Sequence, residues 1–209
     1  MTRSEIASWG RMMRFASFMA LLVACGSPAW RLLDGKSLGA WKVTEYGGQG
    51  AVTPENGALR VGMGNPLSGI HWSGAECPRT NYEFGLEAMK IDGSDFFCGI
   101  IFPVGKESCS FIAGGWGGGV TGLSSVDAMN ASENETATHR SYAKNRWYLF
   151  RLRVTPEKIE VWIDKDKVVD LDLSNRHLSV HPSVELACPL GIANFSTTSL
   201  FRNVTLKKL

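Results

Sequence analysis

Apolar and polar side chains alternate along residues 147–164, and this alternation limits the folds open to the chain more than any other feature. Apolar residues occupy every second position of 148–154 and of 159–163, on either side of a Thr-Pro-Glu-Lys stretch typical of a turn. Successive side chains of a strand point to opposite faces, so a period of two marks a strand with one buried face. The pattern therefore predicts an antiparallel hairpin that covers a core with one face.

Shorter strand-like runs recur along the rest of the chain, and we find almost no helical periodicity. Turn residues such as Asn56-Gly57 separate many of these runs. No linker or internal repeat interrupts them, so we expect a single all-β domain, a jelly-roll sandwich of two antiparallel sheets. Besides the hairpin, the expected strands cover residues 51–53, 58–61, 82–91, 96–102, 168–173, 190–194 and 200–206.

The N-terminal residues are typical of a targeting segment. Three arginines precede an apolar run at 15–24, which is too short for a membrane span of about 20 residues. The run ends in Leu-Val-Ala-Cys at 22–25, which resembles the lipobox of bacterial lipoproteins. We therefore expect a lipoprotein signal peptide at 1–24 and a lipid anchor on Cys25, which alone would hold the domain of residues 25–209 in the cell envelope. An ordinary secretory signal is the alternative.

The charge balance of the chain argues against nucleic acid as a partner. The chain has 22 Lys and Arg against 20 Asp and Glu, and residues 1–24 hold three Arg and one Glu. The expected mature domain therefore carries no net charge with His neutral, and it has no basic run that would attract phosphates. A neutral carbohydrate fits this composition better.

Four cysteines follow Cys25, and an exported domain is allowed disulfides. Cys98 and Cys109 flank an expected hairpin turn at 103–106, so a disulfide between them is one hypothesis, and a Cys77–Cys188 pair would follow by elimination. The other hypothesis is that all four are buried thiols. No Cys or His spacing is typical of a zinc site.

A glycine-rich loop at 114–119 surrounds Trp116. Glycines allow the backbone to approach a ligand closely, and an aromatic face packs well on the C–H surface of a sugar ring. We therefore consider Trp116 a candidate substrate-binding residue.

A long polar stretch at 124–143 follows, and long loops on compact sandwiches often carry function. Asp127, Asn134, Glu135 and His139 are its candidate site residues. Together they would form a polar substrate site or bind a divalent metal, because carboxylate and amide oxygens suit Ca²⁺ and histidine suits a transition metal. A solvated loop without a ligand is the alternative.

Three segments resemble a known family. Residues 32–43 (LLDGKSLGAWKV), 82–88 (YEFGLEA) and 189–209 (PLGIANFSTTSLFRNVTLKKL) are similar, in order and spacing, to the landmarks of the 3-keto-disaccharide hydrolase domain. The resemblance implies a concanavalin A-like jelly roll with a ligand groove on a concave sheet face. It also implies action on glycosides oxidised at C3. At 95–102 and 108–112 the sequence lacks the polar motifs that many members carry, so it resembles a divergent branch.

Elimination from a 3-keto-glycoside needs a general base, a group that stabilises the enolate oxygen, and an acid for the leaving group. Our candidate catalytic residues are Glu87, Asp95, Glu135 and His139, with Glu87 contributing if its strand face is the concave one. The first hypothesis is therefore a hydrolase or lyase of 3-keto-glycosides in the cell envelope. The second is a non-catalytic, lectin-like module in which Trp116 and loop residues hold a glycan.

Overall fold

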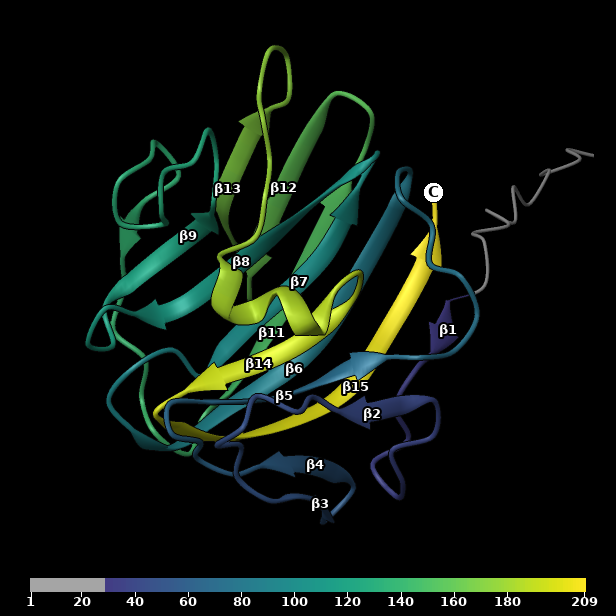
Figure 1. Ribbon diagram of the computed structural model, residues 1–209, viewed down its shortest axis with the longest axis vertical. Helices are drawn as coiled ribbons and strands as arrows, with labels where there is room; N and C mark the ends of the chain where they lie inside the picture. The colour runs from purple at the N-terminus through teal and green to yellow at the C-terminus, as the bar shows by residue number, and fades with distance from the viewer. Residues whose placement is uncertain (1–28) are drawn as a thin grey trace, which may run out of the picture.

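The computed structural model describes residues 29–209, and Figure 1 shows them as two facing sheets. The helix in this range is a single 3-10 segment, η1 (Pro182–Ala187). The part of the chain that the structure describes has no helix long and apolar enough to cross a membrane. The expected all-β jelly-roll sandwich is thus confirmed. The expected signal peptide at 1–24 and the lipidation site Cys25 lie outside the described residues.

The larger sheet has eight strands, and its central strands come from distant parts of the chain. The long strand β6 (Tyr82–Gly93) lies between β11 (Trp147–Val154) and β15 (Thr197–Lys208), antiparallel to both. The outer strands on one side are β12 (Lys158–Ile163) and β13 (Asp166–Asp172), and on the other side β4 (Ala58–Val61) and β3 (Val52–Glu55), while β1 (Trp30–Arg31) also pairs with β15.

The smaller sheet has seven strands, with β7 (Cys98–Val104) between β8 (Glu107–Gly115) and β14 (Gly191–Phe195). Its remaining strands are β9 (Val120–Ser124) and β10 (Thr138–His139) on the β8 side, and β5 (Leu67–Trp72) and β2 (Trp41–Val43) on the β14 side. Only Ser196 separates β14 from β15, so the chain passes directly from the middle of one sheet to the middle of the other.

The predicted hairpin is present as β11 and β12. Phe150 lies opposite Ile163 and Leu152 opposite Val161, and all four side chains are fully buried between the sheets. The Phe150 ring lies 6.0 Å from that of Phe97 across the core. Removing such a buried ring typically costs about 3–5 kcal/mol, so the alternation read from the sequence marks a main source of stability.

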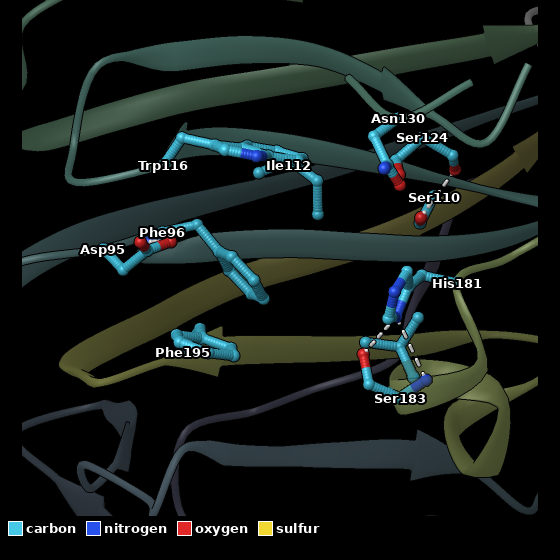
Figure 2. Close-up of a pocket in the computed structure, with 11 residues that line it drawn as sticks. Asp95, Phe96, Ser110, Ile112, Trp116, Ser124, Asn130, His181, Ser183 and Phe195 are labelled. Carbon is cyan, nitrogen blue, oxygen red and sulfur yellow. Dashed lines mark hydrogen bonds between the residues drawn. The ribbon is translucent and has the colours of Figure 1, made fainter. Parts of the chain in front are cut away.

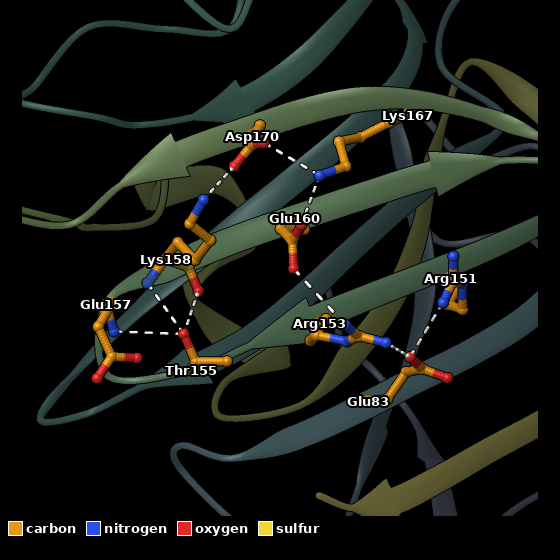
Figure 3. Close-up of polar contacts among 9 residues, drawn as sticks. All are labelled: Glu83, Arg151, Arg153, Thr155, Glu157, Lys158, Glu160, Lys167 and Asp170. Atoms are coloured by element: carbon orange, nitrogen blue, oxygen red, sulfur yellow. Dashed lines mark hydrogen bonds and ion pairs between the residues drawn. The ribbon is translucent and has the colours of Figure 1, made fainter.

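The outer faces of the two sheets differ in character. The eight-stranded sheet presents charged side chains, and Figure 3 shows them paired across strands: Glu83 accepts from Arg153 at 3.1 Å, and Lys167 donates to Glu160 at 2.6 Å. The outer face of the seven-stranded sheet is instead largely apolar and covered by η1 and nearby loops. The buried residues of this second cluster, from the sheet and from its cover together, are Leu67, Phe96, Ile101, Ile112, Val120, Ala131, Val184, Ala187 and Ala193.

Of the two hypotheses for the cysteines, the Cys98–Cys109 disulfide is wrong, and the alternative of free thiols agrees with the structure. The turn at Gly105-Lys106 is close to its predicted place, but its register sets Cys98 opposite Ala113 and Cys109 opposite Phe102. The two sulfurs therefore lie at different levels of the hairpin. Among the described residues all the cysteines, including Cys77 and Cys188, are free thiols.

This register predicts the reactivity of the thiols. Burial raises the pKa of Cys98, and it raises that of Cys109 to about 12, so neither thiol ionises readily in the folded protein. We expect iodoacetamide to leave both unmodified at pH 8 and to modify both in denaturant without prior reduction, as read by peptide mass spectrometry. A peptide pair joined by a Cys98–Cys109 disulfide would contradict the structure.

Candidate functional site

A pocket of about 360 Å³ opens on the outer, apolar face of the seven-stranded sheet (Figure 2). Its floor comes from the sheet strands, and its walls come from the turn between β8 and β9, the loop after β9, and η1. The lining residues are Asp95, Phe96, Ser110, Ile112, Trp116, Ser124, Asn130, His181, Ser183, Val184 and Phe195.

The pocket has two chemically different ends, on opposite sides of Ile112 in Figure 2. We call one the aromatic end; it consists of Asp95, Phe96, Trp116 and Phe195. We call the other the polar end; it consists of Ser110, Ser124, Asn130, His181 and Ser183.

Trp116 stands on a tight turn at the aromatic end. The Gly118 N–H donates to the Gly115 carbonyl at 3.2 Å, and Trp116 and Gly117 both have positive φ, 50° and 82°. These values are typical of a type I′ hairpin turn, in which Asn and Gly are favoured and a bulky side chain is strained. Trp116 is nevertheless 49% exposed as a residue, so the strain is not explained by packing of the indole in a core.

Hydrogen bonds to the Asp95 carboxylate connect the turn of Trp116 to the sheet. The carboxylate accepts the N–H of Phe96 at 2.8 Å and the N–H of Gly117 at 2.9 Å. The Asp95 carbonyl oxygen accepts from the buried Lys90 ammonium at 3.3 Å. Burial lowers the pKa of Lys90, an effect that the nearby Asp95 opposes. Asp95 is thus at the pocket, as expected, but each of its carboxylate oxygens already has a backbone partner.

The polar end is built around His181, which caps η1. Its Nδ1 lies 2.7 Å from Ser183 Oγ and 3.2 Å from the Ser183 nitrogen. Across the pocket, Ser110 Oγ donates to the Ser124 carbonyl at 2.7 Å. The Asn130 side chain also lines this end and forms no hydrogen bond within residues 29–209 that we find. His181 and Asn130 therefore offer free polar atoms to a ligand.

The polar stretch after β9 does not form the expected metal site. Asn134 is almost fully buried and holds the loop together: its Nδ2 donates to the Leu123 carbonyl at 2.8 Å, and its Oδ1 accepts from Thr136 Oγ1 at 2.6 Å. Within residues 29–209, no three acidic, His or Cys side chains gather closely enough to hold a metal. The amide of Asn134 is occupied by the loop itself, so it shapes the wall of the pocket.

The other candidates of that stretch lie outside the pocket. Asp127 and Glu135 both bind the guanidinium of Arg176, Asp127 at 2.7 Å. His139 is exposed on the edge strand β10, opposite Val120. Of these residues, only Asp127 and Glu135 are brought together, and the Arg176 guanidinium between them offsets part of their negative charge.

Glu87 lies on the outer face of the eight-stranded sheet, whereas the pocket lies on the outer face of the seven-stranded sheet. Glu87 therefore does not reach the pocket. Arg202 donates to one of its oxygens through Nε at 2.9 Å and through Nη2 at 2.7 Å, and Asn203 donates to the other at 2.6 Å. The structure therefore separates Glu87, Asp95, Glu135 and His139, and Asp95 is the one that lines the pocket.

Comparison with known families decides the wider assignment. The model of the 3-keto-alpha-glucoside-1,2-lyase-like domain matches residues 29–207. The chain belongs to this family. The resemblance read from the sequence is thus confirmed, and the protein is a carbohydrate-related domain. A comparison with curated proteins found no match.

Solved structures similar to this lyase-like domain include proteins with different roles. The carbohydrate-binding module CBM66 from Bacillus subtilis gives a TM-score of 0.53 at 14% identity, over 81% of this chain and 96% of the module. A candidate glycosyl hydrolase from Parabacteroides distasonis gives 0.54 at 13% identity, over 87% and 94%. Domain 4 of the arabinanase AbnA from Geobacillus stearothermophilus gives 0.54 at 12% identity, over 81% and 82%. At these identities the likeness shows the shared fold.

Sequence reasoning missed most of the pocket of this lyase-like domain. His181, Ser183 and Asn130 were not singled out, because their place depends on how η1 and the loop after β9 fold over the sheet. One signal was present: residues 96–104 are apolar almost without a break, which is typical of a strand covered on both faces. That run therefore indicates that the seven-stranded sheet, which contains β7, has apolar side chains packed on both of its faces.

The ion pair between Glu87 and Arg202 predicts that the stability of the fold depends on pH, while ligand binding in the pocket does not depend on this pair. Burial raises the pKa of Glu87, but the bonds from Asn203 and Arg202 outweigh it, so the pKa lies below the ordinary value. A lowered carboxyl pKa stabilises the fold above the unfolded-state pKa and stops doing so as pH falls through the folded-state value. We expect Glu87→Gln to cost about 1 kcal/mol at pH 7 and less towards pH 3, in urea denaturation. Ligand binding should not change.

The strained turn predicts a gain in stability from loss of the indole. Asn adopts positive φ more readily than Trp, so Trp116→Asn should raise the free energy of unfolding by about 1 kcal/mol. Urea denaturation with an unchanged m-value would measure this. A destabilised variant would show that the indole contributes more to the fold than its exposure indicates.

Proposed function

We propose that this domain binds 3-keto-glycosides with the oxidised ring at the polar end of the pocket and cleaves them there. The observation that carries this proposal is that His181 and Asn130 present polar atoms to the same end of one pocket, in a domain of a lyase-like family. A base and a hydrogen-bond donor are the groups that such cleavage requires.

The reaction is an elimination followed by addition of water. A base takes the hydrogen from C2, which the neighbouring C3 ketone makes acidic. The electron pair of that C–H bond forms a double bond between C1 and C2, and the bond from C1 to the glycosidic oxygen breaks. The departing oxygen takes up a proton. Water later adds across the double bond, with its hydroxyl on C1 and a hydrogen on C2, so that the net result is hydrolysis.

His181 is our candidate for the base. In the cap, Nδ1 accepts the Ser183 N–H at 3.2 Å, so the ring hydrogen is on Nε2; in the other tautomer Nδ1 donates to Ser183 Oγ, 2.7 Å away, and Nε2 is free to accept a proton. Action as a base would therefore use the second tautomer, which gives up the contact with the Ser183 N–H and keeps the one with Ser183 Oγ. The unpartnered amide of Asn130 would donate to the C3 oxygen as negative charge develops on it.

Hydrolysis by two carboxylates fits the pocket less well. That chemistry needs a pair of acidic side chains flanking the scissile bond. Among the described residues that line the pocket, Asp95 is the one carboxylate, and both of its oxygens accept backbone N–H groups.

A non-catalytic carbohydrate-binding module is the second candidate. The separation of Glu87, Glu135 and His139 from the pocket favours it, since fewer catalytic groups converge than the sequence predicted. Two proteins of similar fold are described as a carbohydrate-binding module and as an arabinanase domain in complex with arabinotriose. Exposed Trp116 would then act as a stacking platform.

Turnover of a 3-keto-disaccharide by His181→Asn separates the two functions. Asn can still cap η1 but cannot act as a base, so we expect kcat to fall about 100-fold or more with KM changed only a few-fold. The measurement is release of free sugar by mass spectrometry, in buffer with and without chelator.

The matched control is His177→Asn, because the His177 side chain is 91% exposed and is not part of the pocket lining. It should retain full turnover. Wild-type protein that binds the sugar without cleaving it would overturn the enzymatic proposal and support the binding module. Full turnover by His181→Asn would remove His181 from the mechanism.

A further inference from the structure

The aromatic end and the polar end of the pocket lie at different levels along the strands of the sheet. Ile101 pairs with Ser110 on one side and with Gly191 on the other, so the polar end is level with the start of β14. The Phe195 N–H donates to the Phe96 carbonyl at 3.0 Å, so the aromatic end is level with the last residue of β14. The four-residue rise between Gly191 and Phe195 is about 13 Å.

We infer that the aromatic end is a subsite for an aromatic aglycone, so that the preferred substrates are aryl 3-keto-glycosides and not disaccharides. This inference rests on the proposed function, because it assumes that the oxidised ring occupies the polar end. The leaving group then lies along the strands towards Phe96, Trp116 and Phe195.

The three aromatic side chains provide apolar surface on several sides of this subsite. The Phe96 and Phe195 rings lie 5.7 Å apart, tilted by 40°, and Figure 2 shows both rings with Trp116 around the same space. The Phe96 ring packs closely on Gly99, because a Cβ atom added at Gly99 would lie only 3.0 Å from the ring. A flat ring that enters this space gains offset or edge-to-face contacts with rings that are already in place.

A second sugar would find few polar partners in the same place. The carboxylate oxygens of Asp95 each accept a backbone N–H, and its carbonyl accepts from Lys90 and from Thr197 Oγ1 at 3.0 Å. The polar atoms left for a ligand at this end are the remaining acceptor sites of the Asp95 carboxylate and the Trp116 indole N–H. Hydroxyl groups placed against the phenylalanine rings would lose water without full replacement.

The charge at this end also favours a neutral occupant. The buried Lys90 ammonium donates to the Asp95 carbonyl oxygen, and its positive charge lies near the negative carboxylate of the same residue. An uncharged aromatic ring requires no ionic partner at this end.

Equilibrium binding tests this inference in the His181→Asn protein, where the proposed cleavage is blocked. The ligands are methyl and phenyl 3-keto-glucosides of one anomeric configuration and a 3-keto-disaccharide, measured by calorimetry. We expect the phenyl glycoside to bind about tenfold more tightly than the methyl glycoside, and the disaccharide to resemble the methyl glycoside.

Trp116→Ala in the same background should reduce the phenyl preference to within about threefold and leave the methyl affinity unchanged. Leu186→Ala is the matched control, because Leu186 is an exposed apolar residue of η1 that does not line the pocket. It should keep the full preference.

The binding results test the aryl subsite and the proposed function separately. A phenyl glycoside that binds no more tightly than the methyl glycoside, or less tightly than the disaccharide, would overturn the aryl subsite and leave the proposed function in place. Failure of all three ligands to bind would overturn the proposed function and the subsite with it. A phenyl preference that survives Trp116→Ala would place the aglycone elsewhere.

Discussion

The burial of both faces of the seven-stranded sheet is the constraint on which the rest of the structure depends. One face packs on the eight-stranded sheet, and the other carries its own apolar cluster, which η1 and the loop after β9 partly cover. Each large apolar side chain buried in this way stabilises the fold by about 1.5–3 kcal/mol. Where the cover is incomplete, the apolar floor remains open as the pocket, so the site is a gap in a second core.

The edges of this gap are positioned by polar contacts with the backbone. Asp95 joins the turn of Trp116 to the start of β7, Asn134 closes the loop that carries Asn130, and His181 caps the short helix. Each contact replaces a hydrogen bond that an irregular segment would otherwise make to water. The walls of the pocket are therefore fixed although none of them is a regular strand.

The sequence predicted the features that depend on local pattern. The alternation at 147–164 gave the hairpin, and the landmarks at 32–43 and 189–209 gave the family. Asp95 and Trp116 were placed at the pocket because turn residues and glycines are visible in the sequence. The role of Glu87 and the pairing of Cys98 depended on which sheet face is covered and on hairpin register, and neither is encoded in neighbouring residues.

The direct passage from β14 to β15 has a consequence for how the molecule forms. These last two strands lie in the interior of different sheets, where β14 joins β5 to β7 and β15 joins β4 to β6. Until residues 191–208 are present, each sheet remains split into two parts whose contacts span long stretches of sequence. Completion of both sheets therefore depends on these two strands, and contacts between residues so far apart in sequence are typical of slow folding.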